Sequence, residues 1–168
     1  MPIETIEFNG VQYPMFQTNG NAARFCRPFA LEVLIGVGLD IGVSRKEWAF
    51  PNSIPIDISF DDGYHAMNLP DYEYDYIHSS HMAEHFVGNL ADMFDHWATR
   101  LKKEGVLFLY LPDMDSQLYW RPENNRKHFH YTTPKIIGDY FRNNPKFKNV
   151  FVSGVDAYNS FTVMCEKV

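Results

Sequence analysis

The stretch His81-Met82-Ala83-Glu84-His85 combines residue types that can bind a metal ion or move a proton. Two such histidines on one face of a helix can hold Zn²⁺ while the glutamate between them activates water. That chemistry requires the motif to lie within a helix. Here it follows Tyr74 to Ser80, whose composition after a Pro-Asp turn predicts a strand. The context therefore favours a ligand-binding corner at the carboxyl edge of a parallel sheet, without a metal.

A zinc-dependent hydrolase remains an alternative interpretation of the same motif. It would use His81 and His85 as ligands and Glu84 as the base, with Glu123 or His128 as a third ligand. Short motifs match by chance, and the predicted strand context argues against this alternative.

Four histidines are candidates for catalysis, because the pKa of an imidazole lies near neutrality and suits a general base. His81 and His85 follow one predicted strand, and His128 and His130 follow the next. The other interpretation of His85 is a core-facing side chain that hydrogen-bonds to backbone. The segment 121–130 is either a solvated loop or, given its length and the preceding Tyr119 and Trp120, a lid over a ligand.

Periodicity and turn residues predict the elements that position these side chains. Helices are expected from Asn21 to Leu34 with a kink or restart at Pro28, along the stripe from Leu90 to Leu101 with termination at 102–105, and after the Thr133 cap through Phe141. Strands are expected at 36–42, 53–58, 74–79, 106–111, 147–153 and 161–168. The run 106–111 is apolar without alternation, as in a strand covered on both faces.

This order predicts an α/β fold with a Rossmann-like open, mostly parallel sheet and a C-terminal antiparallel hairpin. Residues 1–168 should form one domain, of which 1–35 are an N-terminal extension and helix. The interval 43–56 is short, because a crossover takes about a dozen residues before its strand is counted. The first crossover helix should therefore shrink to a turn around 46–49.

Composition limits the partners that the chain can have. A formal net charge of -6 argues against a nucleic-acid or anionic-membrane surface, because phosphate binding needs clustered Lys and Arg. Cys26 and Cys165 cannot build a disulfide framework, and each is expected to be a small buried apolar side chain. With neither a leader pattern nor an apolar run of membrane-spanning length, a reducing, cytoplasmic location is the expectation.

Several segments, taken in order, resemble the class I S-adenosylmethionine-dependent methyltransferases. Gly38-Leu39-Asp40-Ile41-Gly42 is similar to the first motif of that family, and Asp57 stands where its acidic residue ends the second strand. Asn68-Leu69-Pro70 resembles the adenine-side loop. The segments 74–85 and 101–107 resemble the two motifs that follow, so the resemblance covers about residues 36–113.

The resemblance implies S-adenosylmethionine as cofactor and methyl transfer to a small-molecule or sugar-type acceptor. The implied cofactor-binding residues are Asp40, Gly42, Asp57, Asn68, Leu69, Ser79 and Ser80. A carboxylate such as Asp57 can accept the two ribose hydroxyls, although an aspartate there can also simply cap a turn. Gly42 lets backbone approach a ligand because it has no Cβ, although it can also be a plain strand-ending turn.

A catalytically inactive binding module with a methyltransferase shape is the second alternative. Its support is the loop Gly42-Val43-Ser44-Arg45-Lys46, in which the family's second and third glycines are replaced. It predicts no binding of S-adenosylmethionine, and unlike the hydrolase it predicts no zinc.

Overall fold

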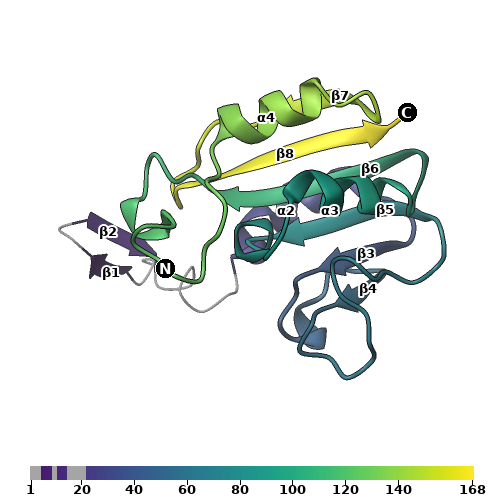
Figure 1. Ribbon diagram of the computed structural model, residues 1–168, viewed down its shortest axis with the longest axis horizontal. Coiled ribbons are helices and arrows are strands. Elements are labelled where there is room, and N and C mark those ends of the chain that lie inside the picture. The colour runs from purple at the N-terminus through teal and green to yellow at the C-terminus, as the bar shows by residue number, and fades with distance from the viewer. Residues whose placement is uncertain (1–4, 9–10, 15–21) are drawn as a thin grey trace.

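The computed structural model describes residues 5–8, 11–14 and 22–168, and Figure 1 shows their arrangement. The strands are β1 (Thr5–Phe8), β2 (Val11–Pro14), β3 (Gly38–Ile41), β4 (Ser53–Ile56), β5 (Tyr74–Ser80), β6 (Leu101–Pro112), β7 (Phe147–Val152) and β8 (Ser160–Lys167). The α-helices are α2 (Ala23–Val33), α3 (Leu90–Ala98) and α4 (Pro134–Arg142). The described residues also contain three short 3₁₀ helices: η1 (Lys46–Trp48), η2 (Ala83–His85) and η3 (Leu118–Trp120).

One six-stranded sheet organises the chain from β3 onward, in the order β4-β3-β5-β6-β8-β7. The pairs β3–β4, β3–β5 and β5–β6 are parallel, whereas β8 runs antiparallel to both β6 and β7. The predicted Rossmann-like open sheet with a C-terminal antiparallel hairpin is therefore confirmed. The carboxyl ends of β3, β4, β5 and β6 lie at one edge.

Helices cover the sheet on both faces. In Figure 1, α3 and α4 lie on the near face and α2 lies behind the sheet. Along β6 the side chains alternate accordingly: Leu107 and Leu109 belong to the core on the α3 and α4 side, and Phe108 and Tyr110 to the core on the α2 side. All four are at most 2% exposed, as predicted for a strand covered on both faces.

The predicted starts of α3 and α4 and the short crossover agree with the structure, whereas the predicted helix start at Asn21 lies outside the described residues. Thr133 caps α4 by accepting a hydrogen bond from the Ile136 amide, and Pro28 lies inside α2. Between β3 and β4 the chain forms only η1, which is the shortened crossover. β1 and β2 pair with each other in a separate two-stranded sheet that the sequence patterns did not predict.

The end of α3 differs from the prediction. The apolar stripe suggested a helix through Leu101, but α3 ends at Ala98. Leu101 instead begins β6 and pairs with Tyr74, which leaves a register irregularity between Tyr74 and Tyr76. Leu101 is fully buried in either arrangement, so periodicity alone could not separate a last helical turn from a first strand residue.

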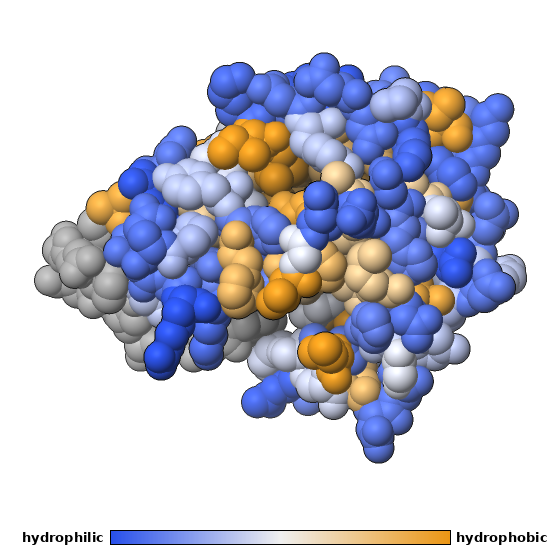
Figure 2. All heavy atoms as spheres, viewed as in Figure 1, coloured by the Kyte–Doolittle hydropathy of each residue, from blue (hydrophilic) through white to orange (hydrophobic). Residues whose placement is uncertain are grey.

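Both cysteines are free and buried, as expected of small apolar side chains. Burial raises the pKa of each thiol, Cys26 and Cys165, to about 12, which keeps both protonated near neutral pH. Among the described residues, no helix combines the length and apolar character that crossing a membrane would require. In the view of Figure 2 the surface is mainly hydrophilic, with hydrophobic residues gathered in small groups.

Trp97 ties α3 to the loop that follows β4. Its side chain is fully buried, and its Nε1 donates a hydrogen bond to the Ala66 carbonyl at 2.8 Å. We expect Trp97→Phe to lower the free energy of unfolding by about 1 to 3 kcal/mol, because the partly buried hydrogen bond to the Ala66 carbonyl is lost. Urea unfolding measures this. Tyr72→Phe, at an exposed position, is the control and should change the free energy of unfolding by less than about 0.5 kcal/mol. Equal losses in the two variants would contradict the role given to the Trp97 hydrogen bond.

Candidate functional site

A cavity of about 650 Å³ opens at the carboxyl ends of β3, β4 and β5. Its wall comes from the β3–η1 turn, the loop after β4 and the corner between β5 and η2. The lining residues are Ile41, Gly42, Ser44, Ile56, Asp57, Ile58, His65, Ala66, Met67, Ser80, His81, Met82, His85, Phe86 and Val87. The wall is mainly apolar with a few polar groups, which is the composition of a small-molecule site.

Three predicted cofactor-binding residues line this cavity: Gly42, Asp57 and Ser80. Asp57 follows β4, and its Oδ1 accepts hydrogen bonds from the amide and hydroxyl of Ser59 at 2.8 and 2.5 Å. Asp57 thus caps a turn with one oxygen, and its Oδ2 has no partner among the described residues. The Ser80 hydroxyl is buried and also lacks a partner there. These two groups are free to hydrogen-bond to a ligand.

Gly42 is needed at the end of β3 for a reason other than ligand approach. Its φ is +89°, a backbone conformation that residues other than glycine rarely adopt. A Cβ there would lie 2.2 Å from Met82 Cγ and 2.4 Å from Met82 Cβ. The space that the glycine leaves open is therefore filled by Met82, which links the first turn to the β5 corner.

Two other predicted cofactor-binding residues, Asp40 and Ser79, are buried and lie outside the cavity lining. Asp40 accepts a hydrogen bond from the Phe50 amide at 2.8 Å, and its other oxygen lies 2.8 Å from His78 Nδ1. The Ser79 hydroxyl donates to the Ile41 carbonyl at 2.8 Å. Their polar groups are thus occupied by contacts that hold β3, β5 and the turn after η1 together.

The loop after β4 lines the cavity with neighbours of the predicted residues. Asn68 is exposed, and its Nδ2 donates to the Gly63 carbonyl at 2.9 Å. Leu69 is buried in the main core. Besides Asp57 and Ile58, the residues of this loop that line the cavity are His65, Ala66 and Met67. Residue type gave no signal for them, because a tight turn decides which side chains face inward; the amides and carbonyls of His65 and Asn68 pair across it.

The chain leaves β5 through a sharp corner. His81 has φ +49°, in the left-handed region, and the three-residue η2 follows. The motif His-x-x-Glu-His therefore does not lie on an α-helix, as its strand context predicted. His81 and His85 both line the cavity. His85 is 42% exposed at its side chain and hydrogen-bonds through Nδ1 to the Lys127 carbonyl at 2.9 Å, so it bonds to backbone without facing the core.

Glu84 is fully buried between these two histidines. Its Oε1 lies 3.7 Å from His81 Nδ1 and 3.7 Å from His85 Nε2, which is too long for hydrogen bonds. Neither carboxyl oxygen has a hydrogen-bond partner among the described residues. Burial raises the pKa of this carboxyl to about 8. The backbone carbonyl of Glu84 accepts from the Phe129 amide at 2.7 Å, which brings the later loop against η2.

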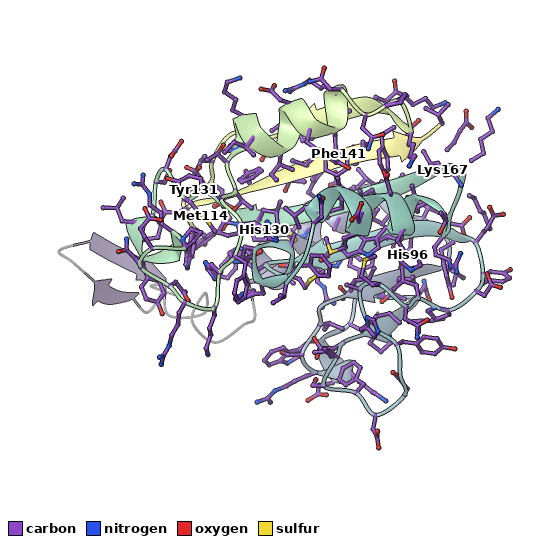
Figure 3. All side chains as sticks on the ribbon, in the orientation of Figure 1. His96, Met114, His130, Tyr131, Phe141 and Lys167 are labelled. Atoms are coloured by element: carbon purple, nitrogen blue, oxygen red, sulfur yellow. The ribbon has the colours of Figure 1, made fainter. Side chains whose placement is uncertain are left out.

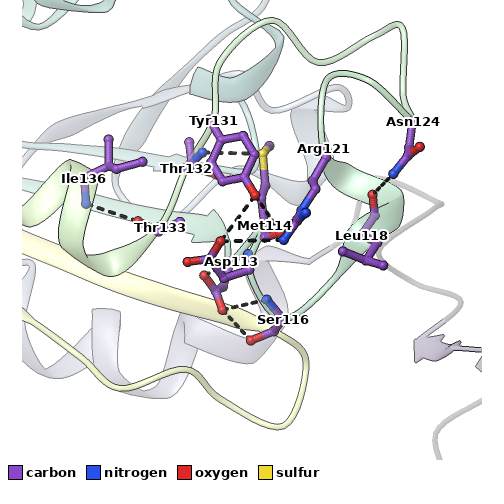
Figure 4. A network of polar contacts seen from close by, with 11 residues as sticks. Asp113, Met114, Ser116, Leu118, Arg121, Asn124, Tyr131, Thr132, Thr133 and Ile136 are labelled. Atoms are coloured by element: carbon purple, nitrogen blue, oxygen red, sulfur yellow. Dashed lines mark hydrogen bonds and ion pairs between the residues drawn. The ribbon is translucent and has the colours of Figure 1, made fainter.

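Contacts with its own backbone order the loop after β6, as Figure 4 shows. Arg121 Nε donates to the Met114 carbonyl at 2.7 Å, and Tyr131 donates through its hydroxyl to Asp115 at 3.2 Å. In Figure 3, Tyr131 lies beside Met114, whereas its neighbour His130 lies away from that pair. These contacts hold the loop together, and the hydrogen bond from the Phe129 amide to the Glu84 carbonyl places it beside η2.

The loop places its two histidines differently. His128 is buried, and its Nδ1 hydrogen-bonds to the Trp120 carbonyl. One ligand atom each of Glu84, His85 and His128 lie within 4.8 Å of one another. His130 is outside that group, with Nε2 hydrogen-bonded to the Phe86 carbonyl at 2.8 Å. Of His128 and His130, only His128 lies close to Glu84 and His85.

Burial keeps the histidines of this corner neutral. It lowers the pKa of His81 to about 3 and that of His128 to about 4, because a desolvated imidazolium is unfavourable. The pKa of His85 is lowered by burial as well. A neutral imidazole has one nitrogen lone pair, which can accept a proton or bind a cation.

Comparison with known proteins agrees with this architecture. A family defined by a methyltransferase domain matches residues 18–144. The structure is similar to a SAM-dependent methyltransferase from Archaeoglobus fulgidus, with 14% identity, a TM-score of 0.66, and coverage of 91% of this chain and 98% of that one. No curated protein sequence matches the chain.

Two further solved structures have the same fold. One is a SAM-dependent methyltransferase from Thermotoga maritima, with 17% identity, a TM-score of 0.60, and coverage of 86% of this chain and 89% of that one. The other is the N-methyltransferase NodS from Bradyrhizobium japonicum in complex with S-adenosyl-l-homocysteine, with 12% identity, a TM-score of 0.58, and coverage of 91% and 88%. At these identities the similarity shows a class I methyltransferase fold.

The contact between Gly42 and Met82 can be tested with a pair of glycine variants. Gly42→Ala should lower the free energy of unfolding by more than about 2 kcal/mol, because it adds a clash with Met82 to backbone strain. Gly63→Ala is the matched control: its φ is +79°, but nothing lies within 4 Å of the added Cβ. It should cost about 1 kcal/mol. Thermal and urea unfolding measure both, and equal losses would contradict the role given to Met82.

Proposed function

Because the chain belongs to the methyltransferase-domain family, we propose that it transfers a methyl group from S-adenosylmethionine to a small-molecule acceptor. The observation that carries the proposal is the cavity at the carboxyl ends of β3, β4 and β5, with the Asp57 carboxylate in its wall. Ligands of open α/β sheets bind in crevices at this edge. S-adenosylmethionine supplies a methyl group on a positively charged sulfur.

The residues present fit such a nucleoside cofactor. The unpartnered oxygen of Asp57 can accept hydrogen bonds from ribose hydroxyls. The exposed Ile58 and Met67, 85% and 38% accessible, offer apolar surface to a base beside Asp57. The orphaned Ser80 hydroxyl gives a further polar contact that the protein itself leaves unused. Gly42 serves the cavity indirectly, by accommodating Met82.

The work of the site would be to position two reactants and exclude water, because direct methyl displacement needs aligned groups more than reactive side chains. Of the four candidate catalytic histidines, His81 and His85 line the cavity, His128 lies against His85 with ring centroids 4.5 Å apart, and His130 is held by backbone. A net charge of -6 favours a small molecule or sugar over a nucleic acid as acceptor.

Calorimetric titration with S-adenosylhomocysteine, the product form of the cofactor, tests the proposal. We expect micromolar binding, and we expect Asp57→Asn to weaken it at least about tenfold, since the amide can still cap the Ser59 turn but lacks the charge that strengthens a hydrogen bond. Asp62→Asn is the control, because Asp62 caps a similar turn at the Tyr64 amide and does not line the cavity.

Each outcome of this titration has a definite meaning. Loss of affinity in Asp57→Asn with normal affinity in Asp62→Asn supports the cofactor site. Absence of binding by the unmodified protein would contradict methyl transfer and leave the inactive binding module. Equal affinity of all three proteins would remove Asp57 from the site.

A further inference from the structure

We propose that Glu84, His85 and His128 form a binding site for a divalent transition-metal ion of the zinc type. The site lies at the end of the cavity where His81 and His85 contribute to its wall. The inference concerns ligation only and does not depend on the methyl-transfer proposal. It also differs from the zinc hydrolase interpretation, because Glu84 is a ligand here and the motif is not helical.

The proposed ligand atoms already surround one point. The three lie within 4.8 Å of one another, and Glu84 Oε1 is 3.7 Å from His85 Nε2. Ligands of tetrahedral zinc lie about 2.1 Å from the metal, and therefore about 3.4 Å apart. Closing this difference needs a shift of roughly an ångström. The partly exposed His85 has the freedom to move by that amount.

Both histidines are held in the tautomer that a metal requires. His85 Nδ1 and His128 Nδ1 hydrogen-bond to the carbonyls of Lys127 and Trp120. A carbonyl only accepts, so each Nδ1 carries the proton and each Nε2 keeps its lone pair. Metal-binding histidines are oriented by this kind of contact to backbone carbonyl or carboxylate.

Glu84 provides an independent indication of a missing cation. Its carboxyl group is fully buried, and neither oxygen has a hydrogen-bond partner among the described residues. Imidazole nitrogens of His81 and His85 each lie 3.7 Å from its Oε1. A buried carboxylate facing the lone pair of His85 Nε2 is unfavourable unless a proton or a cation lies between them. A metal ion satisfies all of these groups together.

The fold fixes the third ligand in place. The amide of Phe129 donates to the Glu84 carbonyl at 2.7 Å, and His130 bonds to the Phe86 carbonyl at 2.8 Å. These contacts flank His128 and bind its loop to η2. His128 is buried against His85, with ring planes at 81°. The ligands thus come from two loops that the protein holds together without the metal.

The ligand types select the class of ion. Two imidazoles and one carboxylate suit zinc, cobalt or iron, whereas Mg²⁺ and Ca²⁺ prefer oxygen ligands and water. His81 Nδ1 lies 3.7 Å from Glu84 Oε1 and can approach the ion as a fourth donor. We therefore expect selectivity for Zn²⁺ over Mg²⁺.

Titration of the untagged full chain with zinc sulfate tests the site. We expect one equivalent to bind, and Co²⁺ to give visible absorption bands typical of nitrogen ligation. Glu84→Gln and His85→Gln should each weaken Zn²⁺ binding at least about 100-fold. His65→Gln is the matched control, because His65 lines the same cavity outside the cluster and should leave the affinity unchanged.

Circular dichroism of each variant separates loss of ligation from loss of fold. If Glu84→Gln does not fold, the test of the metal site rests on His85→Gln, because His85 is partly exposed. Absence of Zn²⁺ binding, equal binding of Mg²⁺, or full affinity in His85→Gln would overturn the site. Titration of the same samples with S-adenosylhomocysteine keeps the two proposals apart. Binding of S-adenosylhomocysteine without binding of Zn²⁺ would reject only the metal site. Binding of Zn²⁺ without binding of S-adenosylhomocysteine would reject only the proposed function.

Discussion

Parallel pairing of β3, β4, β5 and β6 is the constraint on which the rest of the structure depends. It places four carboxyl ends at one edge of the sheet, so the turns after them must share the same space. Asp57 is distant along the chain from Ser80 and His85, yet all three line the same cavity at this edge. The cavity lies between these turns, and the antiparallel β8 pairs with the other side of β6, so that its first residue, Ser160, reaches this edge and hydrogen-bonds to His81.

The short crossover after β3 changes how this edge is filled. A single 3₁₀ turn, η1, replaces a full helix, and the turn at Gly42 packs against Met82 from the β5 corner. The glycine is thus required by a contact within the protein, whatever ligand lies beside it. The same corner puts His81 in a left-handed conformation, a strain that closely packed surroundings must maintain.

Buried polar groups have different roles on the α2 face of the sheet and at its carboxyl edge. On the α2 side, Asp40 and His78 satisfy each other and the Phe50 amide, which stabilises the fold. At the carboxyl edge, Glu84 and Ser80 are buried without partners among the described residues. Unsatisfied buried groups cost free energy, and their concentration beside a cavity is the expected sign of a site that a ligand completes.

The sequence by itself determined the order of elements from α2 onward, the open sheet, the terminal hairpin and the shortened crossover, because periodicity, caps and turn residues are local properties. It also identified Gly42, Asp57, Ser80, His81 and His85, which stand at strand ends. It did not predict the β1–β2 pair. It could not tell that α3 ends at Ala98, because Leu101 is buried in either arrangement.

Only the tertiary structure decided which polar residues share a site. Asp40 and Ser79 have suitable types and positions, but strand alternation turns them into internal contacts. His128 joins Glu84 and His85 because a backbone hydrogen bond from Phe129 to Glu84 holds two loops together. Long-range pairing of that kind leaves no local pattern in the sequence, since it depends on where the folded sheet brings the two loops.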